Sequence, residues 1–370
     1  MKICCIASHL AGGGAARVLS LLANQWSARG ESVTMVTLTS TEADAYELDG
    51  QVNRVALDVE TESRSSVWAI AHNVRKIGAL RRAVASTAPD VVISFVDRVN
   101  VLTLLACVGL RVPVLVSERI HPSYHDVGTI WTVLRRLTYP LADALVVQSE
   151  AVRSWAERLV SPRRTRVIPN PVGDRFHAPV GATPASRRPI VLGVGRLVAQ
   201  KGFDLLIRAF HVVFQAHSEW SLKIVGEGPQ EAELKRLAAQ LLPPTSVLFA
   251  GPTKDLQRYY QDAALFALPS RYEGFPNALL EAMACGCAVI STACPGGTAE
   301  IVRHDIDGVL VPPNDVTALA TEMERLMRDE SERKRLGDRA VESSLRFRPD
   351  GILALWDSLF SDVGVVREVV

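Results

Sequence analysis

The sequence predicts an α/β protein with two doubly wound domains, each built on a mainly parallel sheet. At 370 residues the chain is too long for one ordinary hydrophobic core, so two domains are expected. Short apolar runs alternate with stretches of helical periodicity, which is typical of parallel sheets covered by helices. A proline-rich passage at residues 169–189 separates two such series and is the predicted linker. We expect the two domains to face each other across a cleft.

The first series begins with an apolar run at Lys2–Ile6, a glycine loop, a helical stretch at Ala15–Arg29 and an apolar run at Ser32–Leu38. This order predicts a strand, a turn, a helix and a second strand. Further strands are expected at residues 90–95, 112–117 and 144–147, and helices at residues 67–86 and 129–141. Residues 1–172 are therefore assigned to an N-terminal domain.

The second series repeats this alternation. It predicts strands at residues 190–194, 221–225, 247–250, 264–268 and 308–311, and helices at residues 204–216 and 230–240. Residues 173–350 are assigned to a C-terminal domain. An amphipathic helix is expected at residues 351–360, and we expect residues 351–370 to cross back to the N-terminal domain.

Composition excludes several classes of protein. Hydrophobic residues make up 48% and charged residues 22% of the chain, as in soluble globular proteins. No apolar run reaches the roughly 18 residues that span a bilayer, so we expect a cytoplasmic protein. The net charge of +1 gives no general attraction to nucleic acid. The six cysteines form no CxxC pair and are predicted to be buried free thiols.

The loop after the strand at residues 190–194 carries two cations. It reads GVGRLVAQKG, in which Gly195 allows close approach of a ligand and Arg196 and Lys201 are basic. Ligands of parallel sheets bind beyond the carboxyl ends of the strands. Because the segment contains no acidic residue, a diphosphate would supply the missing counter-charge. Two solvated surface cations remain the alternative.

The loop after the strand at residues 264–268 opens a helix. It reads PSRYEGFPNALLEAMACG, and Pro276 suits the first helical position. The amides of Asn277 and Ala278 would then be donors at the positive end of the helix, which predicts an anion site. Glu273 and Glu281 flank this tip, and near a diphosphate their favourable partners are sugar and ribose hydroxyls. Solvated glutamates are the alternative.

Two segments of the N-terminal domain could also lie beside a ligand. The glycine run that includes Gly13 and Gly14 allows close backbone approach, but it lacks the GxGxxG spacing of a dinucleotide site. After the strand at residues 112–117 come Glu118, Arg119 and His121. These side chains directly follow a strand, where ligands of parallel sheets bind, and an ordinary loop histidine is the alternative for His121.

Four segments together resemble the family 4 glycosyltransferases, which have the GT-B fold. They are GVGRLVAQKG, EGFPNALLE, ACGCAVIST and GVLVPPND, and the resemblance covers nearly the whole chain. The segments SHLAGGGAARV and SERIHP resemble those members that extend lipid-linked oligosaccharides or surface polysaccharides in bacteria.

The resemblance implies that the N-terminal domain binds the acceptor and the C-terminal domain binds the nucleotide sugar. The expected acceptor side comprises Gly13, Gly14, Glu118, Arg119 and His121. Arg119 would meet an acceptor phosphate, and His121 would touch the donor sugar or the acceptor.

The resemblance also implies roles for the donor site. Arg196 and Lys201 would bind the donor diphosphate and stabilise its departure, and with Glu273 they are the expected catalytic residues. Glu281 would hold the ribose hydroxyls. The whole expected donor site comprises Gly195, Arg196, Lys201, Glu273, Gly274, Phe275, Asn277, Ala278 and Glu281.

The implied reaction is retaining transfer of a hexose or N-acetylhexosamine to a hydroxyl of a glycan acceptor, expected to be lipid-linked. The donor is a nucleotide diphosphate sugar, with a UDP-sugar favoured and a GDP-sugar as the alternative. No metal and no cofactor are expected, and Asp305 and Asp307 are interpreted as turn residues rather than a Mg²⁺ site. Two rival functions stay open: a nucleotide-sugar 2-epimerase-like isomerase, and a catalytically inactive binding or scaffold homologue.

The front of the chain also suggests contact with a membrane. Residues 1–172 hold more basic than acidic residues, and the segment TIWTVLRRLTYPL mixes apolar side chains with Arg135 and Arg136. Basic residues also recur at helical spacing at Arg75, Lys76, Arg81 and Arg82. This pattern predicts a surface for anionic lipid, on the inner face of the plasma membrane. A solvated face with ordinary core packing is the alternative.

Overall fold

The computed structural model describes residues 1–60, 66–179 and 187–365. The chain divides into two compact units, each described here by itself. One unit joins Met1–Pro171 to the segment that begins at Pro349, and the other is Val172–Arg348. Part of the expected linker, residues 180–186, and the last five residues lie outside the described ranges.

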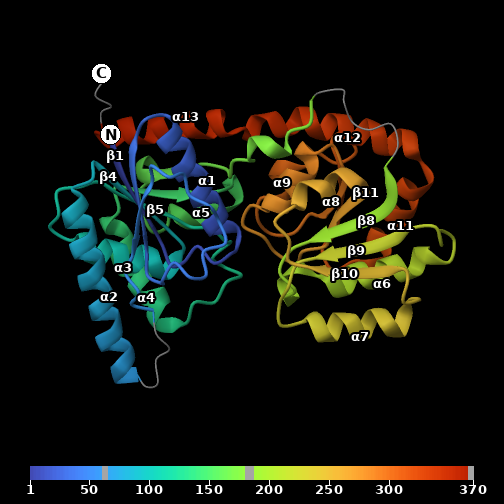
Figure 1. Ribbon diagram of the computed structural model, residues 1–370, viewed down its shortest axis with the longest axis horizontal. Coiled ribbons are helices and arrows are strands. Elements are labelled where there is room, and N and C mark those ends of the chain that lie inside the picture. Colours follow the sequence, from blue (N-terminus) through green and yellow to red (C-terminus); the bar gives the residue numbers. More distant parts are fainter. Residues whose placement is uncertain (61–65, 180–186, 366–370) are drawn as a thin grey trace. The chain divides into compact units, whose positions relative to one another are not determined.

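The N-terminal unit is built on a parallel sheet (Figure 1). In spatial order its strands are β3 (Asn53–Ala56), β2 (Ser32–Thr37), β1 (Lys2–Ala7), β4 (Val91–Phe95), β5 (Val114–Ser117), β6 (Ala144–Val147) and β7 (Thr165–Val167). The order reverses between β1 and β4, where the chain crosses from one half of the sheet to the other. Such a reversal leaves a crevice at the carboxyl ends of the two strands.

Helices cover both faces of this sheet. On one face lie α1 (Gly14–Ala28) and α13 (Pro349–Asp362), and Trp26 of α1 meets Trp356 of α13 edge to face at 5.9 Å between ring centroids. The other face carries α2 (Ser66–Thr87), α3 (Asp97–Cys107), α4 (Thr129–Thr138), the short 3-10 helix η1 (Tyr139–Leu141) and α5 (Glu150–Ala156). A further 3-10 turn, η2 (Pro162–Arg164), precedes β7.

The C-terminal unit repeats the design. Its parallel strands run in the order β10 (Val247–Gly251), β9 (Ser221–Val225), β8 (Arg188–Val194), β11 (Ala263–Leu268), β12 (Ala288–Thr292) and β13 (Val309–Val311). The strand order of this sheet reverses between β8 and β11, which pair directly. Both sheets are doubly wound, so the predicted fold class is confirmed.

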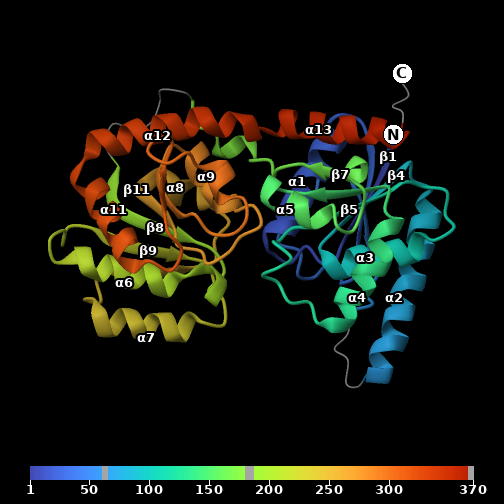
Figure 2. The same cartoon turned by 180° about the vertical axis from the view of Figure 1, so that it is seen from behind.

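The helices of the C-terminal unit again form two layers (Figure 2). One face is covered by α6 (Phe203–Phe214), α7 (Glu231–Leu241) and α11 (Val316–Arg328). The other is covered by α8 (Leu256–Asp262), α9 (Asn277–Ala284), α10 (Thr298–Ile301) and α12 (Glu330–Ser344). The remaining 3-10 turns are η3 (Asp174–Phe176), η4 (Ala199–Lys201) and η5 (Leu345–Phe347).

The cysteines and the helices bear on two further expectations. All six cysteines are buried and free, as predicted, and burial raises the pKa of the Cys107 thiol to about 11. None of the helices among the described residues combines the length and the apolar character that crossing a membrane requires.

Candidate active site

The two loops that carry the predicted donor residues meet at the reversal of the C-terminal sheet. Lys201 ends η4, on the loop after β8, and Glu273 lies on the loop after β11. Because β8 and β11 are neighbouring parallel strands, both loops leave the same edge of the sheet side by side. This is the place where open α/β sheets bind ligands.

Lys201 and Glu273 form an ion pair. The Lys201 Nζ lies 2.5 Å from Glu273 Oε1, and Ser270 Oγ donates to the same oxygen at 2.7 Å. Glu273 is buried at 4% exposure. The basic segment has no acidic residue of its own, but the fold brings one from 72 positions along the chain. The lysine is therefore already oriented, and part of its charge is balanced by a neighbouring carboxylate.

Arg196 differs from Lys201. Its side chain is exposed at the end of β8, and its guanidinium makes no hydrogen bond or ion pair with the residues that the structure describes. The pair of cations expected from the sequence thus consists of one oriented lysine and one arginine that is open to a ligand.

Helix α9 begins one residue later than the sequence predicted, at Asn277 instead of Pro276. Pro276 is the residue that caps the helix, with φ −73° and ψ 106°, so the prediction of Pro276 as the first helical residue is wrong. The first backbone bonds of the helix run from Leu279 and Leu280 to the Pro276 carbonyl, at 3.2 and 3.3 Å. The amides of Asn277 and Ala278 come before these donors, at the positive end of the helix dipole.

Glu281 lies one turn further along α9 and is buried. Its Oε2 accepts a hydrogen bond of 3.1 Å from the Tyr260 hydroxyl of α8, and the tyrosine ring is itself fully buried. The solvated-glutamate alternative is therefore wrong for this residue. The role of Glu281 at ribose hydroxyls stays a prediction.

Backbone groups of both donor loops form hydrogen bonds within the unit. The Gly274 carbonyl accepts from the Gly297 amide at 2.9 Å, and the Gly195 amide donates to Val225 at 3.0 Å. Phe275 is buried against Phe347, with ring centroids 5.6 Å apart. These contacts hold the predicted donor loops in place.

Sequence reasoning missed a clamp between the two donor loops. Arg271 grips the Asp204 carboxylate with two hydrogen bonds, of 2.9 and 2.8 Å, and also donates to the Ala199 carbonyl at 2.7 Å. Burial alone would raise the pKa of Asp204, but the hydrogen bonds and charge of Arg271 hold it below the usual range. The Arg271 amide adds a bond of 2.8 Å to Gln200. The clamp therefore fixes the Lys201 loop relative to the Glu273 loop.

Two glycines outside the predicted site let the loops approach. A Cβ atom at Gly296 (φ +123°) would lie 2.0 Å from the Glu273 carbonyl oxygen, and one at Gly226 (φ +137°) would lie 2.0 Å from that of Gly195. Both positions need glycine for their backbone angle and for this contact. A signal was present, because Gly226 directly follows the predicted strand at residues 221–225.

In the N-terminal unit, the glycine run follows β1 and opens α1. Gly13 caps the helix with φ 88°, and Gly14 is its first residue. The Gly13 carbonyl accepts from the Tyr46 hydroxyl at 3.1 Å. The structure places the run at the carboxyl end of β1, which flanks the reversal of this sheet.

Glu118 is enclosed in a buried polar network after β5. Its Oε1 accepts from the Tyr139 hydroxyl at 2.5 Å and lies 3.4 Å from the Arg135 guanidinium. Its Oε2 is buried and has no hydrogen-bond partner among the residues described. Burial raises the pKa of Glu118 to about 7, against the charge of Arg135, and nearby Asp97 adds to the rise. Contact of Glu118 with an acceptor stays a prediction.

Arg119 and His121 follow on the same loop. The Arg119 guanidinium stacks 3.4 Å from the centroid of the Phe95 ring and donates to Asn170 at 2.9 Å. His121 contacts Tyr124 edge to face at 5.0 Å, and its Nδ1 accepts from the Ser123 amide at 3.3 Å. Partial burial lowers the pKa of His121 and favours the neutral ring. Their roles at the acceptor also stay predictions.

Two of the basic residues predicted to face lipid are buried inside the unit. Arg135 is buried against Glu118, and Lys76 is buried and bonds Glu60 at 2.8 Å. The prediction is wrong for these two because helical spacing alone does not tell which face is covered. Arg81 is exposed and donates to the carbonyls of Ala106 and Val108, so its contact with lipid stays a prediction.

The segment from Asp305 to Asp307 forms a turn, as expected. Asp307 is fully buried and accepts from the backbone amide and side chain of Arg303, both at 2.6 Å, and Asp305 pairs with Arg325. Across the described ranges, no group of His, Cys, Asp and Glu side chains has an arrangement that could hold a metal ion.

Two family profiles match the chain, one in each of the two units. The family profile described as "Glycosyl transferases group 1" matches residues 180–343, and that described as "Glycosyl transferase 4-like domain" matches residues 13–171. Sucrose-phosphate synthase from Thermosynechococcus elongatus superposes with a TM-score of 0.83 at 23% identity, over 98% of each chain. This likeness confirms the GT-B fold.

Two relatives of known name extend the comparison. The chain is 30% identical over 365 residues, 98% of its length and 99% of the relative's, to the GalNAc-alpha-(1->4)-GalNAc-alpha-(1->3)-diNAcBac-PP-undecaprenol alpha-1,4-N-acetyl-D-galactosaminyltransferase of Campylobacter jejuni. It is 36% identical over 253 residues to an exopolysaccharide phosphotransferase of Streptomyces coelicolor, a match that covers 68% of this chain and 26% of that protein. The chain therefore belongs to the family 4 glycosyltransferases.

Proposed function

We propose that this protein is a retaining glycosyltransferase that moves a hexose or N-acetylhexosamine from a nucleotide diphosphate sugar to a hydroxyl of a lipid-linked glycan. A UDP-sugar is the favoured donor. The full-length similarity to an N-acetylgalactosaminyltransferase whose acceptor is a diphospho-undecaprenol glycan supports the sugar and acceptor classes. Work on such an acceptor would bring the protein to a membrane surface.

The observation that carries the proposal is the oriented Lys201 on the same loop as the exposed Arg196, where the strand order reverses between β8 and β11. In transfer, the bond from C1 of the sugar to the diphosphate oxygen breaks, and its electron pair stays on that oxygen. The two cations and the tip of α9 would face this growing negative charge. Removing one such preorganised donor typically costs about 3 kcal/mol of barrier.

The remaining groups would position the substrates. The acceptor oxygen forms the new bond to C1 and releases its proton, for which the departing diphosphate is the available base. Glu273, held by Lys201 and Ser270, would contact the sugar hydroxyls, and Glu281 the ribose. In this scheme the side chains carry the electrostatic stabilisation, and we propose no cofactor.

A transfer assay with defined donors tests the proposal. UDP-, GDP- and ADP-sugars are first ranked by thermal shift, since binding to the folded protein raises its melting temperature. The best donor is then incubated with and without a polyprenyl-diphosphate-linked glycan. We expect an elongated glycan and release of nucleoside diphosphate in the presence of the acceptor.

The rival functions give other results in the same assay. A 2-epimerase-like isomerase forms a changed sugar without any acceptor, and a scaffold homologue binds donor or acceptor without turnover. Either outcome would overturn the proposed transfer.

A further inference from the structure

A tyrosine of the C-terminal unit holds the buried carboxylate of α9. The Tyr260 hydroxyl donates to Glu281 Oε2 at 3.1 Å, and both side chains are buried. The two residues come from different helices, since Tyr260 lies in α8 and Glu281 in α9. A carboxylate offers about four lone-pair positions. The bond from Tyr260 takes one of them and fixes the direction of the group.

Packing fixes the ring of Tyr260. Phe176 meets it edge to face, with ring centroids 6.0 Å apart, and Phe266 of β11 does the same at 5.8 Å. The ring belongs to a buried cluster that also contains residues of β8 and α9. Because no part of the tyrosine is exposed, its hydroxyl cannot turn out to solvent. The donor to Glu281 is therefore in place before a ligand arrives, which lowers the entropy lost on binding.

Arg187 fixes the backbone of Tyr260 as well. Its guanidinium donates to the carbonyls of Tyr260 and Cys285, both at 2.6 Å. Tyr260 lies near the end of α8 and Cys285 caps the end of α9, so the cation meets the negative ends of both helix dipoles. A further bond of 3.2 Å reaches the carbonyl of Ala263, the first residue of β11. The helices that carry Tyr260 and Glu281 are thus tied to each other at their carboxyl ends.

We propose that Tyr260 is a positioning residue for nucleotide recognition: by holding one oxygen of Glu281, it aims the carboxylate at the neighbouring 2′ and 3′ hydroxyls of the ribose. The inference rests on the proposed function in one respect, since it takes Glu281 as the group that meets the ribose. Hydrogen bonds from hydroxyls to an ionised carboxylate are strong, and they depend on direction. A site built to bond hydroxyls rejects a ligand that lacks them, because its buried acceptors are left unpaired. Tyr260 therefore sets the preference for a ribose over a sugar without these hydroxyls.

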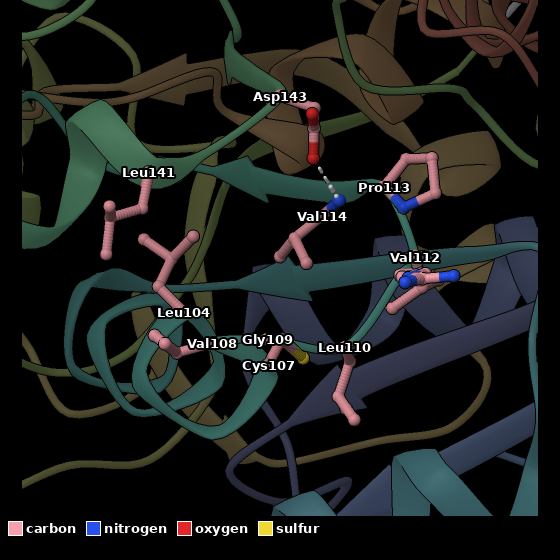
Figure 3. A pocket seen from close by; sticks show the side chains of 11 residues that line it. Leu104, Cys107, Val108, Gly109, Leu110, Val112, Pro113, Val114, Leu141 and Asp143 are labelled. Atoms are coloured by element: carbon pink, nitrogen blue, oxygen red, sulfur yellow. Dashed lines mark hydrogen bonds between the residues drawn. The ribbon is translucent and has the colours of Figure 1, made fainter.

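A pocket of the N-terminal unit is an alternative place for a ligand with hydroxyl groups. It has a volume of about 490 Å³, and its lining comes from the end of α3, the start of β5 and the segment around Leu141 (Figure 3). The carboxylate in this lining, Asp143, accepts from the Val114 amide at 2.7 Å. The pocket lies at the amino end of β5, whereas ligands of parallel sheets bind beyond the carboxyl ends of the strands. The ribose is therefore assigned to Glu281 and not to Asp143.

Calorimetric titration of the full-length protein tests the proposal. The probes are the preferred nucleoside diphosphate and its 2′,3′-dideoxy form, each titrated into the wild type and into Tyr260→Phe. We expect the wild type to bind the ribose form at least tenfold more tightly than the dideoxy form. Tyr260→Phe keeps the ring and loses the hydroxyl, so it should lose most of this preference and bind the dideoxy form as the wild type does. An unchanged preference in Tyr260→Phe, or a wild type that binds both forms equally, would overturn the proposal.

Two matched controls locate the effect. Tyr259→Phe removes the hydroxyl of the neighbouring, partly buried tyrosine of α8 and should keep the full preference for the ribose form. Asp143→Asn removes the charge from the pocket of the N-terminal unit and should keep it too. If Asp143→Asn loses the preference instead, the ribose lies in that pocket and the proposal falls.

Two further readouts show whether Tyr260 acts through Glu281. The double variant Tyr260→Phe with Glu281→Gln should discriminate no less than Glu281→Gln alone, because both changes remove one interaction. Additive losses would mean that Tyr260 acts elsewhere and would overturn the proposal. In transfer assays Tyr260→Phe should raise the KM for the donor severalfold with little change in kcat, whereas a general loosening of the unit would lower kcat as well. A wild type that prefers the ribose form but shows no transfer would sink the proposed function and leave the role of Tyr260 in nucleotide binding standing.

Discussion

Lys201 has two partners in this account: the Glu273 carboxylate that it contacts and the diphosphate that we propose it binds. The ion pair fixes the direction of a flexible side chain before the ligand arrives, which lowers the entropy lost on binding. Arg196 is exposed and has no such partner in the part of the chain that the structure describes, so it keeps its full charge for the ligand. One residue supplies orientation and the other supplies charge.

Replacing Lys201 by alanine should lower the turnover number by two to three orders of magnitude, because one preorganised donor to the leaving group is lost. The measurement is the initial rate of nucleoside diphosphate release at saturating donor and acceptor. Lys235→Ala is the matched control, since Lys235 also pairs with a glutamate but on the surface of α7. Near-normal turnover of the Lys201 variant would contradict the assignment.

Glu118 allows a prediction about pH. Its pKa is about 7 in the folded protein, so between pH values of about 4.5 and 7 the folded chain holds a proton that the unfolded chain loses. The free energy of unfolding therefore falls as pH rises through this window. Glu118→Gln removes this loss, so between pH 5 and pH 8 its stability relative to the wild type should rise by up to about 3 kcal/mol.

The measurement is urea unfolding of both proteins at pH 5 and at pH 8, followed by tryptophan fluorescence. The free energy of unfolding of Glu118→Gln relative to the wild type should be lower at pH 5 than at pH 8, because the Glu118 carboxyl of the folded wild type is protonated and neutral at pH 5. An equal difference at the two pH values would show that Glu118 does not titrate in this range.

At the scale of elements, the predicted strands agree best where the sequence pattern is strongest. The strands at residues 144–147 and 221–225 match β6 and β9 at both ends. The edge strands β3 and β7 were missed because each has only three or four residues and few buried side chains. Helix α3 was missed because nearly every side chain is buried, which leaves no apolar and polar faces to detect.

The Arg271 clamp is predicted to act on donor binding. Arg271→Lys loses the two-pronged grip on Asp204 and should raise the KM for the donor roughly tenfold with a smaller change in kcat. Asp204→Ala should do the same, and the double variant should be no worse than either single one. Steady-state kinetics with varied donor are the test, and additive effects would mean that the two residues act separately.

Helix α13 is predicted to hold the N-terminal unit together. Trp356 is buried at 1% exposure against Trp26 and Phe95, so Trp356→Ala should destabilise this unit by roughly 3–5 kcal/mol. Leu355, an exposed neighbour on the same helix, is the control and should change stability by less than about 0.5 kcal/mol as alanine. Thermal unfolding checks both, and equal melting temperatures would contradict the packing role.

At the scale of the whole molecule, the sequence predicted two doubly wound sheets and the loops that carry the site. The reason is that strand ends and loop composition are local properties. It could not predict the partners within the site, because the Lys201–Glu273 pair and the Arg271–Asp204 clamp join residues 72 and 67 positions apart. Contacts of that kind depend on the order of the strands, which becomes visible in the fold.

The cations that follow β8 are proposed to bind the donor through its diphosphate. This binding is tested most directly by calorimetric titration of the wild type, Lys201→Ala and Arg196→Ala with the preferred nucleoside diphosphate and with its nucleoside. We predict that the wild type binds the nucleoside diphosphate at least a hundredfold more tightly than the nucleoside. This ratio corresponds to a difference in binding free energy of roughly 3 kcal/mol. Each variant should lose most of that preference but keep its affinity for the nucleoside. Variants that retain the full preference for the diphosphate would contradict the account.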